Sequence, residues 1–220
     1  MIKRYYNKYR SIKEMRRMNV IEIICNSLAH KIITSVNGYD ESRIEEISFG
    51  LQLLIGEIPK FFITFILAWL LNIIDLTIIS FMIILPYRMF SGGFHLNTHL
   101  GCIIATNTMY IGSAYLANIL KFNDIVKYIL IAITFIFSFT MIAKYAPADT
   151  ENVPVLQKKE RRKRRIWSFI IAGIELITAI FIPYKVISNM IIIGILVQTF
   201  TITKLAYRIT KNKYGYEVYG

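Results

Sequence analysis

The sequence predicts an all-α polytopic membrane protein. About six membrane-spanning helices would follow an interfacial amphipathic N-terminal helix region, with both termini in the cytosol. Hydrophobic residues make up 55% of the 220 residues and charged residues only 18%, and the mean hydropathy is +0.48. A soluble domain of this size could not bury so much apolar surface. Long apolar runs between polar segments then indicate helices that cross a bilayer, each needing about 20 residues.

Residues 1–46 form a basic, amphipathic region that we expect to lie on the membrane surface. The first twenty residues mix seven Lys and Arg with tyrosines, which in a membrane chain favours contact with membrane lipids over nucleic acid. Residues 20–36 mix apolar and polar side chains, as is typical of an interfacial helix, and Asn37-Gly38 predicts a turn after it. We find no signal peptide pattern and expect the N-terminus to stay cytosolic.

Residues 47–220 are interpreted as one membrane domain. The predicted spans are residues 47–70, 73–90, 101–120, 125–143, 166–182 and 186–205. All but four of the 26 Lys and Arg residues then fall in segments on the cytosolic side, the exceptions being Lys60, Lys121, Lys127 and Lys185. This asymmetry satisfies the positive-inside rule. It places residues 88–102 and a basic loop, residues 144–165, on the cytosolic face.

Three ionisable side chains inside the predicted spans have roles that the sequence leaves open. Glu57 and Lys60 could pair across one helical turn, or Lys60 could extend its charge to the interface. Glu175 has no such local partner. It is either a functional carboxylate or one that bonds to a neighbouring helix.

Residues 88–102 concentrate the groups capable of catalysis, and read Arg-Met-Phe-Ser-Gly-Gly-Phe-His-Leu-Asn-Thr-His-Leu-Gly-Cys. A cysteine attacks as the thiolate and needs a nearby base or positive charge, and His95 and His99 are the candidates for Cys102. In one unbroken helix His95 would stand about 10 Å from Cys102 along the axis, beyond hydrogen-bond reach. His99 would then be the nearer neighbour.

A glycine turn could instead let this stretch fold back. Gly92 and Gly93, after Ser91, accept backbone angles that other residues resist. His95 could then approach Cys102 from a loop while the cysteine opens the third span. The turn could also offer N–H donors to an oxyanion. The residues alone do not decide which histidine acts.

Two non-enzymatic interpretations of the same stretch remain. His95, His99 and Cys102 have a helical spacing that could place three zinc ligands on one face, although the Glu of a His-Glu-x-x-His metalloprotease is missing. The stretch could also be a plain cytosolic turn. The chain would then be a transporter or a metal-binding membrane protein, whereas a thiol enzyme would need no metal or cofactor.

Basic side chains fill the end of the predicted loop 144–165. Seven of eight consecutive residues are Lys or Arg. This basic run comprises Lys158, Lys159, Arg161, Arg162, Lys163, Arg164 and Arg165. Such a run is either a solvated loop that sets topology or a docking surface, because it creates a potential that attracts carboxylates.

Two motifs occur in the order and setting of a known family. The first, between the second and third spans, is Arg88-x-x-Ser91-Gly92-Gly93-x-His95 followed seven residues later by Cys102. The second, residues 144–154, reads Lys-Tyr-Ala-Pro-Ala-Asp-Thr-Glu-Asn-Val-Pro and precedes the basic run. Together they resemble the accessory gene regulator B (AgrB) family of quorum-sensing membrane cysteine endopeptidases, and the similarity in layout covers most of the chain.

The resemblance implies a catalytic dyad in a multi-pass protein of the bacterial cell membrane. Cys102 would be the nucleophile and His95 the general base, with Arg88 and the turn at 91–93 in support and His99 secondary. The implied substrate is a small AgrD-like precursor peptide. Cys102 would release its acidic C-terminal tail and hold the rest as a thioester, which a side chain of the peptide captures to form a cyclic autoinducing peptide. The basic run would hold the acidic tail, and the family pattern suggests a homodimer.

Overall fold

The computed structural model describes residues 20–35, 41–96, 98–150, 154–155 and 157–219, and every regular element within them is a helix. The chain divides into two units, Met1–Phe62 and Ile63–Gly220. The boundary at residue 46 between the membrane-surface region and the membrane domain stays a prediction. Helix α3 (Glu41–Leu70) is continuous through residue 46 and through the boundary between the two units.

The first unit pairs α2 (Val20–Ser35) with the beginning of α3. Ala29 and Ile33 form a buried cluster against Ile47 and Leu51. On the other side of α2, Leu28 is exposed. A helix therefore stands where the sequence predicted one, and its amphipathic character and its place at the membrane surface stay predictions. The predicted turn at residues 37–40 lies outside the described residues.

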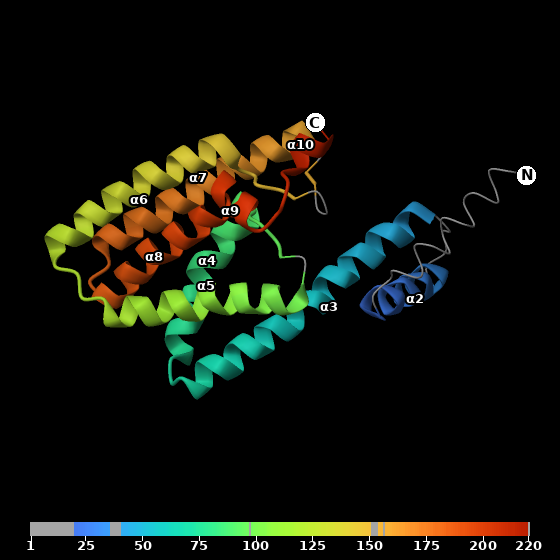
Figure 1. Cartoon of the computed structure of the whole chain (residues 1–220), viewed down its shortest axis with the longest axis horizontal. Helices are drawn as coiled ribbons and strands as arrows, with labels where there is room; N and C mark the ends of the chain where they lie inside the picture. Colours follow the sequence, from blue (N-terminus) through green and yellow to red (C-terminus); the bar gives the residue numbers. More distant parts are fainter. Residues whose placement is uncertain (1–19, 36–40, 97, 151–153, 156, 220) are drawn as a thin grey trace, which may run out of the picture. The chain divides into compact units, whose positions relative to one another are not determined.

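The second unit contains the remaining helices (Figure 1). They are α4 (Ile74–Ser91), α5 (His99–Ile119), α6 (Asp124–Tyr145), α7 (Lys158–Phe181), α8 (Lys185–Thr201), α9 (Lys204–Ile209) and α10 (Gly215–Tyr219). Several helices begin at side chains that cap them. Thr98, Asn123 and Thr203 accept hydrogen bonds from the first turns of α5, α6 and α9, which satisfies N–H groups that a helix leaves unpaired.

Helix α8 is the centre of the second unit, because it contacts α4, α5, α6 and α7. Most of its residues are buried, as expected for a helix that is apolar on all sides. Glycine permits close approach to α4, since a Cβ atom on Gly194 would lie 3.0 Å from Cγ1 of Ile84. Small residues at such crossings are typical of helix packing in membranes.

Three helices among the described residues are long and apolar enough to cross a membrane: Ile74–Ser91, Leu100–Ile119 and Asp124–Tyr145. Ile58–Leu70 and Lys185–Thr201 are apolar but shorter. The helices also expose apolar side chains outward, as α6 does with Ile133 and Ile136, which suits contact with lipid rather than water. The predicted class, a helical membrane protein, is thus confirmed, while six spans and the orientation of the termini stay predictions.

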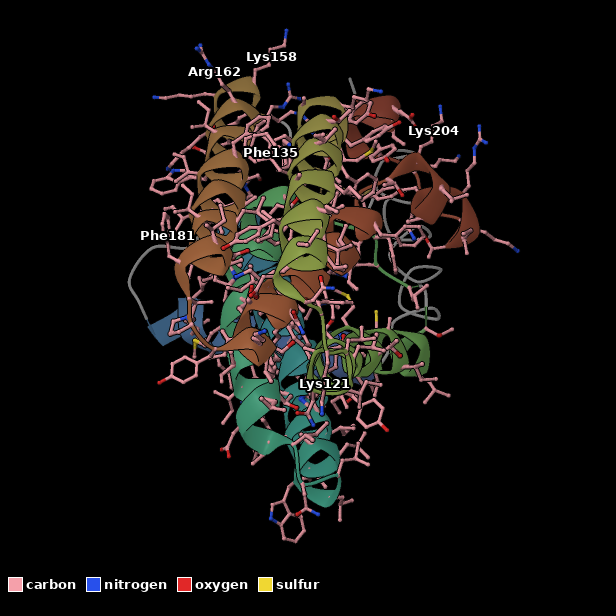
Figure 2. The ribbon with its side chains drawn as sticks, turned by 90° about the vertical axis from the view of Figure 1, so that its left-hand side faces the viewer. Lys121, Phe135, Lys158, Arg162, Phe181 and Lys204 are labelled. Atoms are coloured by element: carbon pink, nitrogen blue, oxygen red, sulfur yellow. The ribbon has the colours of Figure 1, made fainter. Side chains whose placement is uncertain are left out.

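The basic run differs from its prediction, because it is helical rather than part of a loop. It forms the first two turns of α7, which begins at Lys158. Lys, Arg and Glu are good helix formers, and charge alone had suggested a loop. In the side view, Lys158 and Arg162 project at the same end of the second unit as Lys204, whereas Lys121 lies toward the other end (Figure 2).

The last predicted span also differs, since α8 ends at Thr201 rather than at residue 205. Thr203 caps the next helix instead. Lys60 is buried in α3, so its charge does not extend outward from the unit. The side chain of Glu57 lies outside the described residues.

We predict that Gly194→Leu destabilises the second unit, because the new side chain would meet Ile84 and force α8 away from α4. Overpacking of this kind costs about 1–3 kcal/mol. Thermal unfolding in detergent should show a lower midpoint. Gly112→Leu is the matched control, since a Cβ atom at Gly112 meets nothing nearer than 3.8 Å. Equal midpoints for the two variants would contradict this view of the α4–α8 contact.

Candidate functional site

Helix α4 ends in a glycine turn that pairs with the loop after α6. Gly92 and Gly93 have φ angles of 75° and 145°, conformations that favour glycine. The Gly93 N–H donates to the Ala148 carbonyl at 2.9 Å, and the Ala148 N–H donates to the Ser91 carbonyl at 2.8 Å. A Cβ atom on Gly92 would overlap the Ala148 carbonyl group. This pairing of two loops therefore requires glycine at position 92.

The N–H groups of both glycines are used within the chain. That of Gly92 donates to the Arg88 carbonyl at 2.9 Å, and that of Gly93 donates to Ala148. The sequence suggested these groups as oxyanion donors, and that role stays a prediction. In this structure the bonds of both glycines shape the loop.

Gln198 of α8 ties the turn to the centre of the bundle. Its Nε2 donates to Ser91 Oγ at 2.9 Å and to the Gly92 carbonyl at 2.7 Å, and its Oε1 accepts from Arg88 Nη1 at 3.2 Å. The Gln198 side chain is fully buried, where a hydrogen-bonded polar group is strongly held. Gln198, which the sequence did not indicate, thus brings Ser91, Gly92 and Arg88 together.

Arg88 holds the loop that follows the turn. Its Nη2 donates to the Phe94 carbonyl at 3.1 Å and its Nη1 lies 3.5 Å from Thr201 Oγ1. The Phe94 N–H donates to the Thr201 carbonyl at 3.3 Å. Arg88 therefore supports the loop from within, because its guanidinium group is engaged by α8 and by the loop backbone.

Cys102 lies in the first turn of α5 and is partly exposed. Thr98 caps this turn, since its hydroxyl accepts from the Gly101 N–H at 3.1 Å and its carbonyl accepts from the Cys102 N–H at 3.0 Å. The Cys102 thiol donates to the Leu96 carbonyl at 3.4 Å. The loop thus folds back onto the beginning of the helix, and the first turn of a helix favours negative charge.

His95 lies in the loop between α4 and α5 and is exposed. Its carbonyl accepts a hydrogen bond of 2.7 Å from Asn212 Nδ2. Because α5 begins at residue 99, the unbroken helix considered from the sequence is not formed, and the folded-back loop is. The side chain of His99 lies outside the described residues, and so does the three-ligand metal site that would use it. Among the residues that the structure describes, no group of three His, Cys, Asp or Glu side chains could hold a metal ion.

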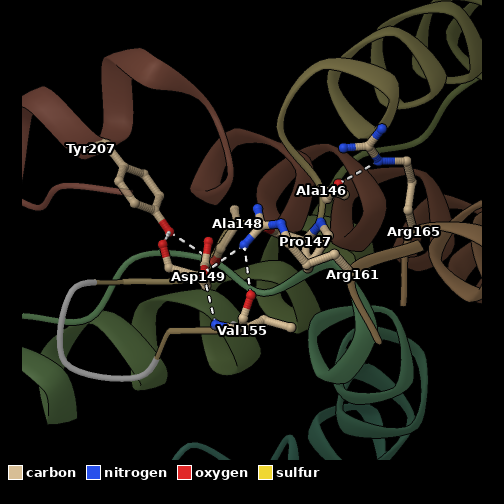
Figure 3. Close-up of polar contacts among 8 residues, drawn as sticks. All are labelled: Ala146, Pro147, Ala148, Asp149, Val155, Arg161, Arg165 and Tyr207. Atoms are coloured by element: carbon tan, nitrogen blue, oxygen red, sulfur yellow. Dashed lines mark hydrogen bonds and ion pairs between the residues drawn. The ribbon is translucent and has the colours of Figure 1, made fainter. Parts of the chain in front are cut away.

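Two members of the basic run hold the loop after α6 (Figure 3). Asp149 Oδ2 accepts from Arg161 Nη1 at 2.7 Å and from the Val155 N–H at 2.8 Å. Arg165 Nε donates to the Ala146 carbonyl at 2.6 Å. Arg161 and Arg165 are therefore structural members of the run, whereas Lys158 and Arg162 have no partner among the residues described.

Two buried tyrosines fix the C-terminal segment against the same loop. Tyr207 donates to the Ala148 carbonyl at 2.8 Å and Tyr214 donates to the Ile202 carbonyl at 2.9 Å, and their rings stack with centroids 3.9 Å apart. Burial raises the pKa of both phenols above the ordinary value of tyrosine. Both hydroxyls therefore stay protonated near neutral pH and remain donors.

A groove of about 560 Å³ opens beside the start of α7. Its lining combines cations with apolar side chains, namely Lys158, Arg161, Arg162, Arg165, Ile166 and Phe169. Four members of the basic run thus line this groove along α7, and its mixed lining suits a chain that carries both carboxylates and apolar groups.

A comparison with protein families matches residues 25–202 to the model described as accessory gene regulator B. The chain belongs to the accessory gene regulator B family. An AgrB-like protein of Listeria innocua is 29% identical over 185 residues, which cover 82% of this chain and 87% of the relative. The accessory gene regulator protein B of Staphylococcus aureus MRSA252 is 28% identical over 173 residues, which cover 78% of this chain and 88% of the relative. No solved structure matches the chain.

Membership of the accessory gene regulator B family supports a role in quorum sensing.

Some residues that shape the site carried no assigned role in the sequence. Asp149 lies within the second motif, and Gln198 is a polar residue inside an apolar run, which is a usable signal in a membrane helix. Asn212 had no signal of this kind. Glu175 is only partly buried, and its buried Oε2 has no hydrogen-bond partner among the described residues.

We predict that Gly92→Ala disrupts the loop pairing. A side chain at this φ angle is strained by about 1–3 kcal/mol, and its Cβ would also push the Ala148 carbonyl away. The variant should unfold at a lower temperature and lose the activity proposed below. Gly112→Ala, in the open middle of α5, should match or exceed wild-type stability. Wild-type behaviour of Gly92→Ala would mean that the two loops are not paired.

Proposed function

We propose that this chain is a membrane cysteine endopeptidase that processes an AgrD-like precursor peptide. One observation carries the proposal: the thiol of Cys102, in the first turn of α5, bonds to the carbonyl of Leu96, the residue next to His95. The nucleophile and the proposed base thus belong to one folded-back loop and helix start, rather than to distant points on one helix. Family membership supports the same assignment.

The chemistry is acyl transfer in two steps. His95 takes the proton of the Cys102 thiol, the sulfur attacks the scissile carbonyl, and the new amino end of the acidic tail leaves with that proton. The N-terminal part of the peptide remains as a thioester on Cys102. A thiol or hydroxyl of the peptide then attacks this thioester and closes a ring, which returns the Cys102 thiol.

Exclusion of water decides whether the peptide is cyclised or merely cut. Exchange of one thioester for another is nearly isoenergetic, whereas hydrolysis of the intermediate is irreversible in practice. A site at the surface of a membrane keeps competing water away from the intermediate. We place it at the cytosolic face, in a chain surrounded by membrane lipids and paired with a second copy.

The acidic tail would be bound by the basic run. Lys158 and Arg162 line the groove beside α7 and are exposed cations that point outward (Figure 2). They are located on α7, near the helix N-terminus, where the helix dipole also attracts anions. Arg161 and Arg165 contribute charge from positions that the loop already fixes.

We expect purified wild-type protein in liposomes to remove the tail of a cognate precursor. Mass spectrometry should find the N-terminal product lighter by one water than the hydrolysed fragment, which marks ring closure. Cys102→Ala should be inactive, and His95→Ala should be slower by about 10²–10⁴-fold, since it loses the general base.

Cys25→Ala is the matched control, because Cys25 is the other cysteine of the chain and is buried in α2. It should retain activity. If folded wild-type protein leaves the precursor uncut, the transporter and metal-binding interpretations would be favoured instead. An active His95→Ala variant with an inactive His99→Ala variant would reassign the base.

We predict that reversing Lys158 and Arg162 to Glu together raises KM for the precursor while leaving insertion intact. Exposed charge contacts contribute about 0.2–1 kcal/mol each, so the rise should be several-fold and should shrink at high salt. Lys204→Glu with Arg208→Glu is the control, since Lys204 is at the same end of the unit (Figure 2) but outside the groove. Equal KM values for the two double variants would discard the docking surface.

A further inference from the structure

Three successive carbonyl groups of the loop that carries His95 are held by three different elements. The Phe94 carbonyl accepts from Arg88 of α4 at 3.1 Å, and the Leu96 carbonyl accepts from the Cys102 thiol of α5 at 3.4 Å. Between them, the His95 carbonyl accepts from Asn212 Nδ2 at 2.7 Å. The C-terminal segment after α9 therefore reaches the loop at the residue proposed as the base.

The orientation of the Asn212 amide follows from its neighbours. Nδ2 faces the carbonyl oxygens of His95 and of Thr210, at 2.7 Å and 3.2 Å. Carbonyl oxygens only accept hydrogen bonds, so the NH₂ end of the amide must point toward them. The contact with His95 is thus a directed donor bond.

A tight turn aims Asn212 at the loop. The Asn212 N–H donates to the Tyr207 carbonyl at 2.9 Å, and the Lys211 N–H donates to the Arg208 carbonyl at 3.2 Å. These two bonds, with Lys211 at φ 55°, form the turn that commonly ends a helix with glycine in the left-handed position. Here a lysine adopts that strained conformation, and the residue after it contacts the loop.

The turn is anchored to the loop after α6 through Tyr207, whose carbonyl accepts the Asn212 N–H. The buried Tyr207 hydroxyl donates to the Ala148 carbonyl at 2.8 Å. Ala148 in turn is paired with Gly93 and Ser91. Asn212 is therefore fixed relative to the beginning of the loop, as a residue that orients another must be.

We propose that Asn212 is a positioning residue, which orients His95 toward Cys102 by holding the His95 carbonyl. The peptide group that links His95 to Leu96 is planar, so a bond to its oxygen fixes the plane between the base and the carbonyl that the thiol contacts. Without this bond the plane can rotate, and both the imidazole and the Leu96 carbonyl shift. This role rests on the proposed function, because it acts through the dyad.

The test uses full-length protein in liposomes, in a Cys25→Ala background, so that Cys102 is the one cysteine. Asn212→Ala and Asn212→Asp both remove the donor, and Asp keeps the shape. Both variants should lower kcat for the precursor by about 10- to 100-fold, the range expected for a misplaced catalytic group, with KM close to wild type. Lys211→Gly, which keeps the turn and removes the neighbouring charge, should leave kcat unchanged.

A second readout does not need the peptide. The rate of Cys102 alkylation by iodoacetamide is measured against pH for wild type, His95→Ala and the Asn212 variants. The Asn212 profiles should shift from the wild-type curve toward that of His95→Ala. A merely structural bond would lower thermal stability without changing the shape of this profile.

The outcomes separate the two levels of inference. If His95→Ala changes both cleavage and alkylation while the Asn212 variants match wild type in both, the positioning role is wrong and the dyad stands. If His95→Ala changes neither, the dyad itself is wrong. If the Asn212 variants raise KM with kcat unchanged, Asn212 contacts the substrate instead of orienting the base.

Discussion

Gln198 makes the hydrogen bonds on which the rest of the site depends. Its buried amide bonds Ser91, the Gly92 carbonyl and Arg88 at once, and so joins the end of α4 to the central helix α8. Inside a protein such bonds are strong, and leaving one buried partner unsatisfied costs about 1–3 kcal/mol. The loop that begins at Gly92 consequently starts from a fixed point, and Arg88 carries that constraint forward to Phe94.

Ala148 extends the same constraint to the rest of the proposed machinery. Its backbone pairs with Ser91 and Gly93 on one side, and its carbonyl accepts from Tyr207 on the other. The next residue, Asp149, is ion-paired with Arg161 of the basic run. The proposed tail-binding helix and the proposed reactive loop are therefore supported by one short segment, and under the proposed function a substrate held at α7 would be presented to a loop of defined position. Endopeptidase chemistry needs this alignment, because catalytic groups lose effect when displaced by about 1 Å.

The helical class of the fold could be predicted from the sequence, because long apolar runs between polar segments indicate helices in a membrane. The glycine turn at 92 and 93 was also readable, since few other residues adopt positive φ angles. The secondary structure of the basic run could not be predicted, because Lys and Arg suit both a solvated loop and the exposed turns of a helix.

The supporting residues of the site were hidden for a different reason. Gln198 and Asn212 act on residues 91–95 from more than one hundred positions away in the chain, and only tertiary packing brings them there. Asp149 lies within a recognised motif, but its partner Arg161 is one of seven similar cations. The spacing of these cations in the sequence does not indicate which of them pairs with Asp149. Local patterns thus suggested candidate reactive groups, whereas the contacts around them could be seen only in the fold.

Trapping the acyl-enzyme tests the central claim most directly. A cognate precursor whose ring-closing side chain is replaced by alanine would be mixed with the protein, quenched in acid and examined by intact mass spectrometry. The proposed mechanism predicts an adduct on Cys102 with the mass of the N-terminal fragment less one water, found in the wild type and absent from Cys102→Ala. Release of the tail without any adduct on wild-type protein, or an adduct that persists in Cys102→Ala, would contradict nucleophilic catalysis by this residue.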